Sequence, residues 1–353
     1  MKIAPLWTLV APIAGWLLLG GTYLGWGGAY LVAVAVGLAA CIVAAVYHAE
    51  VVAHRVGEPF GTLILALAIT LIEVALILTL MVAGGESARA IARDTVFAAV
   101  MIILNGIVGL CLLVGGSRYH EQEFMLQGTT GALTTLAAIA VLTLILPNYT
   151  STTPGPYYSS SQLGFIAVVS LVLYGTFVVV QTVRHRKQFV SAADEPHGNP
   201  PGNAPTAVSG VFLMVALGAV VLNAKALAPT LESLVQVVGA PQAGVGVLIA
   251  MLVLGPEGYS ALKAARANRL QTSLNLALGS ALASIGLTIP AVAVLSLVTG
   301  RTLALGLDAM GTALLVLSLF IAALSLSTGR TTVLQGIVHL VIFAVYLFTT
   351  VVP

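Results

Sequence analysis

Two acidic residues stand inside long apolar runs of this sequence. Glu73 is the one charged residue between Phe60 and Val82, and Glu257 follows Gly255-Pro256 in a second apolar run. A helix rises about 1.5 Å per residue and a membrane core is about 30 Å thick, so Glu73 falls near the midplane. A carboxylate there is costly unless it is protonated, paired or bound to a cation. Glu73 therefore indicates either an ion site or a protonated glutamate that hydrogen-bonds a neighbouring helix.

The surroundings of Glu257 favour oxygen ligands. Pro256 removes a backbone N–H, and the flanking glycines allow the helix to unwind locally, so backbone carbonyls become available. Carboxylates and carbonyls suit Ca²⁺, whereas zinc and copper are disfavoured because neither glutamate has His or Cys beside it. We predict a metal site that uses both glutamates and three further polar side chains: Glu73, Glu257, Asn105, Asn275 and Ser280. Each of the three polar side chains could instead bond across packed helices.

A site with two carboxylates also predicts how transport is coupled. Two protons or one divalent cation would neutralise the pair, and an empty, fully charged site would be costly in a low-dielectric setting. Competition between these two occupied states is the mechanism of an exchanger, because it suppresses return of the empty site.

Composition places the pair in a polytopic membrane protein. The chain has 353 residues, of which 59% are hydrophobic and 7% charged, against about 25% charged in ordinary soluble domains. Cys41 and Cys111 lie in apolar runs and predict no disulfide. We predict an all-α fold with eleven spans, at about 6–25, 28–50, 60–84, 92–115, 127–147, 161–183, 208–230, 242–262, 271–298, 303–325 and 331–352.

A polar stretch divides the chain into two similar halves. We predict a leading helix at 1–27, a five-helix repeat at 28–183, a cytoplasmic linker at 184–207 and a second five-helix repeat at 208–353. Each repeat has a Val-Gly turn with a proline, followed by an apolar run that contains the glutamate. A similar helix then follows, at 93–110 in the first repeat and at 269–287 in the second. Because five is odd, the second repeat must enter the membrane inverted, as in many secondary transporters with midplane sites.

The basic residues predict the orientation. If the N-terminus is cytoplasmic, ten of the 14 Lys and Arg residues lie on the cytoplasmic side, namely Lys2, Arg55, Arg118, Arg184, Arg186, Lys187, Lys263, Arg266, Arg269 and Arg330. The positive-inside rule therefore places the N-terminus and the linker in the cytoplasm and the C-terminus outside, in a bacterial inner membrane.

These elements resemble the α-repeats of the Ca²⁺/cation antiporter superfamily, in particular the cation/proton exchangers and most closely their bacterial ChaA-type branch. Glu73 in AITLIEV and Glu257 in LGPEG stand where the family's GNAxE-type motifs have glutamate, and Gly279-Ser280 resembles the GS pair of the next helix. The sequence departs from that motif at Thr70-Leu71 and Pro256. The resemblance implies export of Ca²⁺, with Na⁺ or K⁺ as further cations, driven by proton entry.

Two other functions remain as alternatives. A monovalent Na⁺ or K⁺/proton antiporter would also use carboxylate and carbonyl ligands. A polytopic membrane enzyme could use the glutamates as general acid and base, but we find no nucleophile–base pair, metal-ligand cluster or phosphate-binding glycine loop in the sequence. We therefore expect no enzymatic activity, no cofactor and no nucleic-acid partner, only the lipid bilayer and the transported ions.

Overall fold

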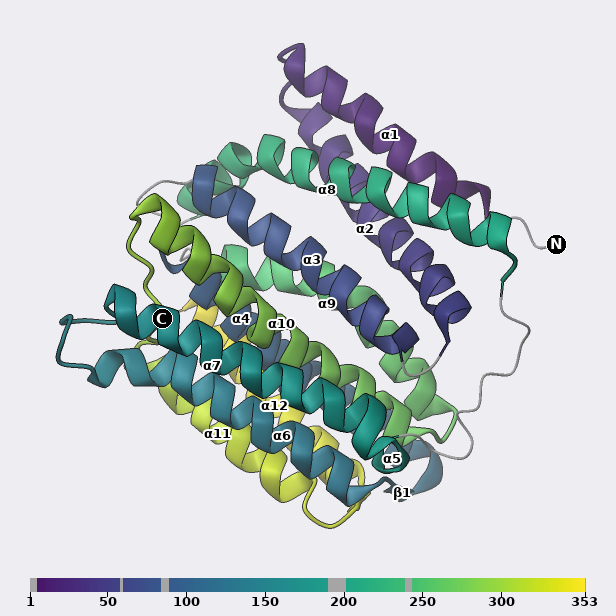
Figure 1. Cartoon of the computed structure of the whole chain (residues 1–353), viewed down its shortest axis with the longest axis vertical. Coiled ribbons are helices and arrows are strands. Elements are labelled where there is room, and N and C mark those ends of the chain that lie inside the picture. The colour runs from purple at the N-terminus through teal and green to yellow at the C-terminus, as the bar shows by residue number, and fades with distance from the viewer. Residues whose placement is uncertain (1–4, 58–59, 84–88, 190–200, 239–242, 353) are drawn as a thin grey trace. The chain divides into compact units, whose positions relative to one another are not determined.

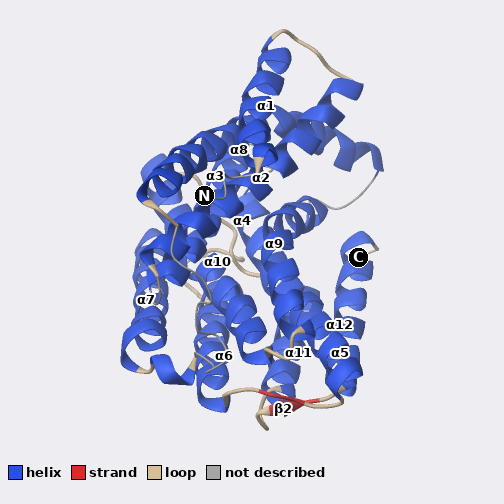
Figure 2. Cartoon of the chain, turned by 90° about the vertical axis from the view of Figure 1, so that its right-hand side faces the viewer, coloured by secondary structure: helices blue, strands red, loops and turns tan. Residues whose placement is uncertain are grey.

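The computed structural model of the chain describes residues 5–57, 60–83, 89–189, 201–238 and 243–352, and nearly all of them are helical (Figure 2). Ten helices are long and apolar enough to cross a membrane, and an eleventh apolar helix, Ala309–Ser325, has 17 residues. These eleven correspond to the predicted spans, so the all-α polytopic fold is confirmed. Both cysteines are free and buried, as expected.

The helices form two compact units that each combine segments from distant parts of the sequence. Unit 1 comprises Met1–Ala88 and His197–Gly239, and unit 2 comprises Arg89–Pro196 and Ala240–Pro353. Each unit thus takes residues from both predicted repeats. This division by packing differs from the predicted division by repeat and does not test it, so the inverted repeat stays a prediction.

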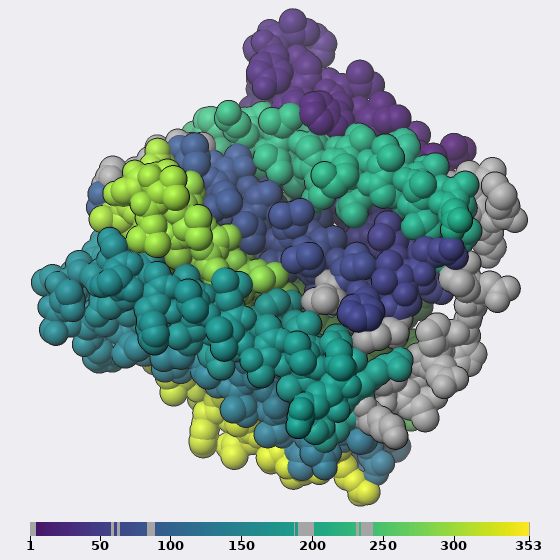
Figure 3. Space-filling model, viewed as in Figure 1, coloured from purple at the N-terminus to yellow at the C-terminus, as the bar shows by residue number. Residues whose placement is uncertain are grey.

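Unit 1 is a group of four helices whose core is α2 against α8. Both of these helices also contact α1 and α3 (Figure 1), and Figure 3 shows the side chains of α8 lying along those of α1. α2 and α8 have 28 and 36 residues and extend beyond the predicted spans. The unit 1 helices are α1 (Leu6–Tyr23), α2 (Ala29–Val56), α3 (Phe60–Ala83) and α8 (Asn203–Val238).

Unit 2 is built around α10, which packs against α4, α6, α7 and α9. α4, a π-helical turn and α5 form one continuous span, Ile91–Tyr119. The unit 2 helices are α4 (Ile91–Met101), η2 (Ile102–Ile107), α5 (Val108–Tyr119), α6 (Leu126–Ala140), η3 (Val141–Ile145), η4 (Leu146–Tyr149), α7 (Ser160–Val179), η5 (Val180–Arg184), η6 (Arg186–Gln188), α9 (Ala243–Arg266), α10 (Leu270–Thr299), α11 (Ala309–Ser325) and α12 (Val333–Val351).

A two-stranded antiparallel ribbon joins the ends of two hairpins in unit 2. β1 (Gln122–Glu123) pairs with β2 (Arg330–Thr331), with Gln122 opposite Thr331 and Glu123 opposite Arg330. Gln122 is buried and donates to the carbonyl of Ala265 at 3.0 Å. The ribbon therefore fixes the α5–α6 and α11–α12 connections next to the end of α9.

The predicted linker at 184–207 is partly helical. Helical turns continue through Gln188, and α8 begins at Asn203. Residues 190–200, which contain the most polar part of the predicted linker, lie outside the described residues.

Candidate cation site

Glu73 lies on the buried face of α3. Its residue is 3% exposed, and Ile69, Ile72 and Leu76, which share its helical face, are equally buried, whereas Leu71 on the other side is about half exposed. The i, i+3, i+4 spacing of these residues explains why one stripe of an otherwise apolar helix is covered by protein. Glu73 is therefore covered by protein rather than exposed on the surface of α3, as expected of a functional or partnered group in a membrane.

Glu257 and Ser280 are brought together in unit 2. Glu257 lies on α9 and is half-buried, and the Ser280 hydroxyl on α10 donates a hydrogen bond to its Oε2 atom. α9 and α10 pack against each other, and the residues near Ser280 in α10 are small, with Gly279, Ala281 and Ala283. A hydroxyl that donates to a carboxylate keeps its own lone pairs available, so this pair can present oxygen atoms to a cation.

The local unwinding expected at Gly255-Pro256 is absent. α9 is helical throughout Ala243–Arg266, with Pro256 inside it. The ring of Pro256 still removes one backbone donor, so the carbonyl of Leu252 loses its usual i+4 partner. Gly258 gives the helix close packing instead, since a Cβ at that position would meet the side chain of Ile107.

Asn105 is fully buried and belongs to a separate polar cluster. It lies in the π-helical turn η2; its Nδ2 donates to Ser318 Oγ at 2.8 Å, and its Oδ1 lies 3.2 Å from His339 Nδ1. Since an amide oxygen only accepts, the hydrogen of this last bond belongs to His339 Nδ1. The amide group of Asn105 therefore joins α11 and α12 to the α4–α5 span.

Asn275 also has partners of its own. Its Nδ2 donates to the carbonyl of Phe189, and its Oδ1 accepts from Gln271 Nε2 at 2.8 Å. Gln271 Oε1 in turn accepts from the backbone N–H of Met125 at 2.5 Å. These bonds attach the first turns of α10 to the chain beyond α7 and to the start of α6, which is a packing role.

Of the five predicted ligands, the described contacts join Glu257 to Ser280. Asn105 and Asn275 are occupied by other groups of unit 2, and Glu73 belongs to unit 1. That the two glutamates share one cation stays a prediction. In the described part of the chain, no three His, Cys, Asp or Glu residues are grouped closely enough to hold a metal ion.

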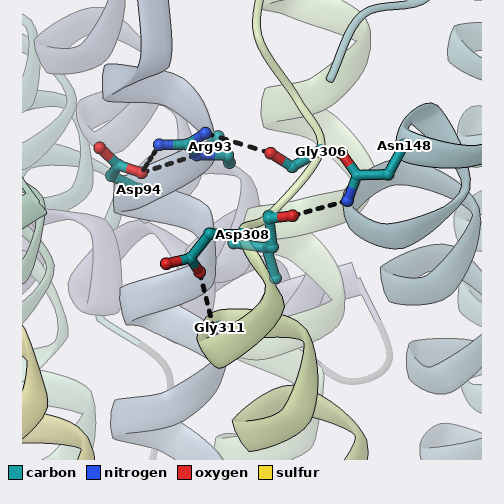
Figure 4. A network of polar contacts seen from close by, with 7 residues as sticks. Arg93, Asp94, Asn148, Gly306, Asp308 and Gly311 are labelled. Atoms are coloured by element: carbon teal, nitrogen blue, oxygen red, sulfur yellow. Dashed lines mark hydrogen bonds and ion pairs between the residues drawn. The ribbon is translucent and has the colours of Figure 1, made fainter. Parts of the chain in front are cut away.

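A polar network at the N-terminal ends of α4 and α11 was not predicted (Figure 4). Arg93 forms an ion pair with Asp94 at 2.8 Å and donates to the carbonyl of Gly306 at 3.1 Å. Asp308 caps α11 by accepting from the N–H of Gly311 at 2.7 Å. The Asp-x-x-Gly spacing before an apolar run was an available signal for that cap. The second partner of Arg93, by contrast, is the carbonyl of Gly306, 213 residues away in sequence.

This network borders a cavity of about 160 Å³ whose lining includes Arg93, Asp94, Asp308, Tyr346 and Thr350. Asn148 supports the same segment by donating to the carbonyl of Leu307 at 2.6 Å. The contacts hold the 301–308 connection against α4 and η4, so we assign this network to the packing of unit 2.

The chain resembles curated proteins over nearly its whole length. It is 48% identical to a putative ionic transporter, y4hA, of Sinorhizobium fredii, over 99% of this chain and 97% of that protein. It is 39% identical to the sodium-potassium/proton antiporter ChaA of Escherichia coli, over 89% of this chain and 86% of that protein. It is 25% identical to a Ca²⁺/H⁺ antiporter of Aphanothece halophytica, over 74% of this chain and 76% of that protein.

Solved structures share the fold at lower identity. The structure of native YfkE matches with a TM-score of 0.74 and 18% identity, over 98% of this chain and 100% of that chain. The H⁺/Ca²⁺ exchanger CAX matches with a TM-score of 0.74 and 15% identity, over 97% of this chain and 87% of that chain.

A family model supplies the remaining comparison. The model described as "sodium/calcium exchanger protein" matches residues 16–183 and 208–352. The first matched segment ends at residue 183, where the first predicted repeat ends, and the second begins at residue 208, where the second predicted repeat begins. With nearly the whole chain covered, and with the antiporter ChaA 39% identical, this protein belongs to the sodium/calcium exchanger protein family.

Proposed function

We propose that this protein is a secondary antiporter that exports Ca²⁺ in exchange for protons, with Glu73 and Glu257 as the groups that bind either the cation or the protons. The observation that carries the proposal is a glutamate, Glu73, turned to the protein-covered face at the middle of a membrane-spanning helix. A carboxylate inside a membrane span is costly unless it is protonated, paired or bound to a cation, and a cation exchanger supplies both protons and cations.

The pair formed by Glu257 and Ser280 supports the same proposal. Both residues supply oxygen atoms in the middle of their helices, and Ca²⁺ prefers hard oxygen ligands. The name of the Aphanothece relative, a Ca²⁺/H⁺ antiporter, is in keeping with this ion pair.

A monovalent cation is the second candidate, and a specific comparison favours it. The E. coli relative with 39% identity is named a sodium-potassium/proton antiporter, whereas the relative named for Ca²⁺ has 25% identity. The same two carboxylates and the Ser280 hydroxyl could coordinate Na⁺ or K⁺. A membrane enzyme loses support, since the relatives with named activities are antiporters.

Everted membrane vesicles test the proposal and separate the two cations. Vesicles containing the protein are energised so that protons accumulate inside, and Ca²⁺, Na⁺ or K⁺ is then added separately. We expect each transported cation to release the proton gradient and to accumulate inside the vesicle, with Ca²⁺ effective at the lowest concentration. A gradient released by Na⁺ or K⁺ alone would assign the protein to monovalent exchange, and no release by any of the three would overturn proton-coupled antiport.

We further propose that the protein lies in a bacterial inner membrane with its N-terminus in the cytoplasm and its C-terminus outside. Ten of the 14 basic residues then lie on the cytoplasmic side. A reporter enzyme that folds only in the periplasm, fused after Pro353, should be active, and the same reporter inserted after Gly202 should be inactive. The reverse pattern would contradict this orientation.

A further inference from the structure

One face of α1 offers backbone carbonyls to side chains of α2 and α8. Three of the four acceptors receive hydrogen bonds from α2: Thr8 from His48 Nε2 at 3.1 Å, Ala11 from Cys41 Sγ at 3.3 Å, and Leu18 from Tyr30 at 2.6 Å. The fourth, the carbonyl of Gly15, receives one from Asn223 Nδ2 on α8 at 3.0 Å. The acceptors are spaced by three, four and three residues, which places them in one stripe along the helix.

Pro12 explains the first of these bonds. A proline has no N–H, so the carbonyl four residues earlier, that of Thr8, loses its helical partner. In a membrane no water replaces that partner, and an unsatisfied carbonyl is costly. His48 supplies the missing donor from the neighbouring helix. Since a carbonyl only accepts, the hydrogen of this bond lies on His48 Nε2.

His48 contacts all three helices. Its residue is completely buried on α2, its Nε2 reaches the carbonyl of Thr8 on α1, and its ring lies 5.6 Å from that of Phe212 on α8. Asn223 has a similar position on α8: the same Nδ2 that reaches α1 also donates to the carbonyl of Ala219 at 2.7 Å. Both residues are thus directed at α1, and Asn223 is also bonded within its own helix.

The backbone of α1 comes close enough for these bonds because Gly15 has no side chain. A Cβ at that position would collide with the sulfur of Cys41 and lie 3.3 Å from the Cβ of Ala219. A further bond runs in the opposite direction, from Trp16 Nε1 of α1 to the carbonyl of Val215 on α8 at 3.1 Å. α1 is therefore attached to both neighbours through polar groups, in addition to apolar packing.

We propose that α1 is a clamp that holds α2 and α8 in one register, and that His48 and Asn223 are positioning residues for cation exchange. In the sequence, α2 is the helix before the Glu73 helix, and α8 is the helix before the Glu257 helix. A tie between α2 and α8 therefore links the segments that precede both glutamates. This proposal assumes that the protein exchanges cations, as its family membership indicates, but it does not depend on which cation is transported.

Three substitutions and one control test the clamp, and His48→Phe is also combined with Asn223→Leu in a double variant. His48→Phe keeps an aromatic ring beside Phe212 but removes the donor, whereas His48→Gln keeps an N–H donor. Asn223→Leu removes the second donor at similar volume. The control is Leu17→Ala, on the exposed side of α1, where Leu17 is 73% exposed. Each purified variant is reconstituted into liposomes, and the exchange rate per folded protein and the apparent KM are measured with a cation that the wild type transports.

We expect the His48→Phe/Asn223→Leu variant to lose about tenfold or more in maximal rate, because the donors that tie α1 to both α2 and α8 are removed. Its apparent KM should stay within about twofold of the wild-type value, because neither residue is a predicted ligand. His48→Gln and Leu17→Ala should retain the wild-type rate. A double variant with the wild-type rate per folded protein would overturn the clamp's role in exchange. If the double variant does not fold, His48→Phe and His48→Gln decide the question by the same comparison.

Labelling of Cys41 gives a readout that does not need transport. Cys41 is completely buried against α1, so a maleimide added to membranes of a Cys111→Ser background should not label it. In the double variant, labelling of Cys41 should increase at least several-fold. An unlabelled Cys41 in the double variant would overturn the clamp itself, whereas a wild type that exchanges no cation would overturn the proposed function and leave the labelling result intact.

Discussion

Glu73 and Glu257 occupy helices of equal length, 24 residues each, but different local surroundings. Glu73, on a unit 1 helix, is almost fully buried, and Glu257, on a unit 2 helix, is half-buried beside the hydroxyl of Ser280. The proposed site thus combines a buried carboxylate with one that accepts a hydrogen bond from a neighbouring helix.

The two glutamates should each be required for exchange. We expect Glu73→Gln and Glu257→Gln to lower cation affinity by about a hundredfold or more, since loss of one charge from a low-dielectric site costs several kcal/mol. Gln keeps the shape and one carbonyl oxygen, so the variants should still fold. The measurement is cation-dependent proton movement in vesicles.

Matched controls for this prediction lie in the β1–β2 ribbon. Glu123 pairs with Arg330 at 2.8 Å, but the side chains are 72% and 63% exposed, and exposed ion pairs contribute little. Glu121→Gln and Glu123→Gln should therefore be nearly silent. Wild-type exchange of every cation by Glu73→Gln would make Glu73 a structural residue.

Ser280 should support Glu257. We expect Ser280→Ala to weaken cation binding by about tenfold, because a hydrogen bond to a charged group contributes about 1.5–3 kcal/mol. The control on the same helix is Thr299→Ala, whose exposed hydroxyl donates to the carbonyl of Leu295 at 2.7 Å. Transport measured against cation concentration tests this, and an unchanged concentration dependence in Ser280→Ala would remove Ser280 from the site.

At the scale of elements, α5 and α12 are brought together by glycines. A Cβ on Gly336 of α12 would collide with the backbone of Leu113, and one on Gly109 of α5 would lie 2.9 Å from the Cβ of His339. This close approach brings His339 within reach of Asn105 in the π-helical turn. The turn, a form often found at functional sites, is thus held by buried polar contacts from α11 and α12.

Two Gly→Ala substitutions, one in a tightly packed position and one in an open position, should distinguish the effect of packing on stability from that of helix propensity. Gly336→Ala should destabilise the protein by about 1–3 kcal/mol, because backbone atoms cannot move aside as a side chain can. Gly131→Ala on α6, where nothing lies within 4 Å of an added Cβ, should be neutral or stabilise by up to about 1 kcal/mol. The Tm of each variant in detergent is the measurement. Equal Tm values would contradict the described contact between α5 and α12.

At the scale of the whole molecule, proton and cation should compete for one set of carboxylates. As pH rises, fewer protons occupy the site, so the apparent cation affinity should increase between about pH 6 and 9. The measurement is the cation concentration that gives half-maximal exchange, determined at several pH values on both sides of the membrane. An affinity that is constant over this range would argue against direct competition.

Four properties could be predicted from the sequence: the membrane class, the eleven helices, the two free cysteines and the helical positions of both glutamates. These properties follow from local composition, since about 20 apolar residues in a row have few options other than a spanning helix. The burial of Glu73 on one face could be read from the same periodicity. The expected unwinding at Pro256 was wrong, because α9 continues through the proline with Gly258 packed closely against Ile107.

Which polar groups contact one another could not be predicted from the sequence. Asn105 finds His339 across 234 residues of sequence, and Asn275 finds Phe189 across 86. His48 likewise bonds the carbonyl of Thr8 on α1, which Pro12 leaves without its usual helical partner. The physical reason is that an apolar span can pack at any angle that buries its small residues, so a polar side chain's partner depends on how distant helices pack rather than on its sequence neighbours.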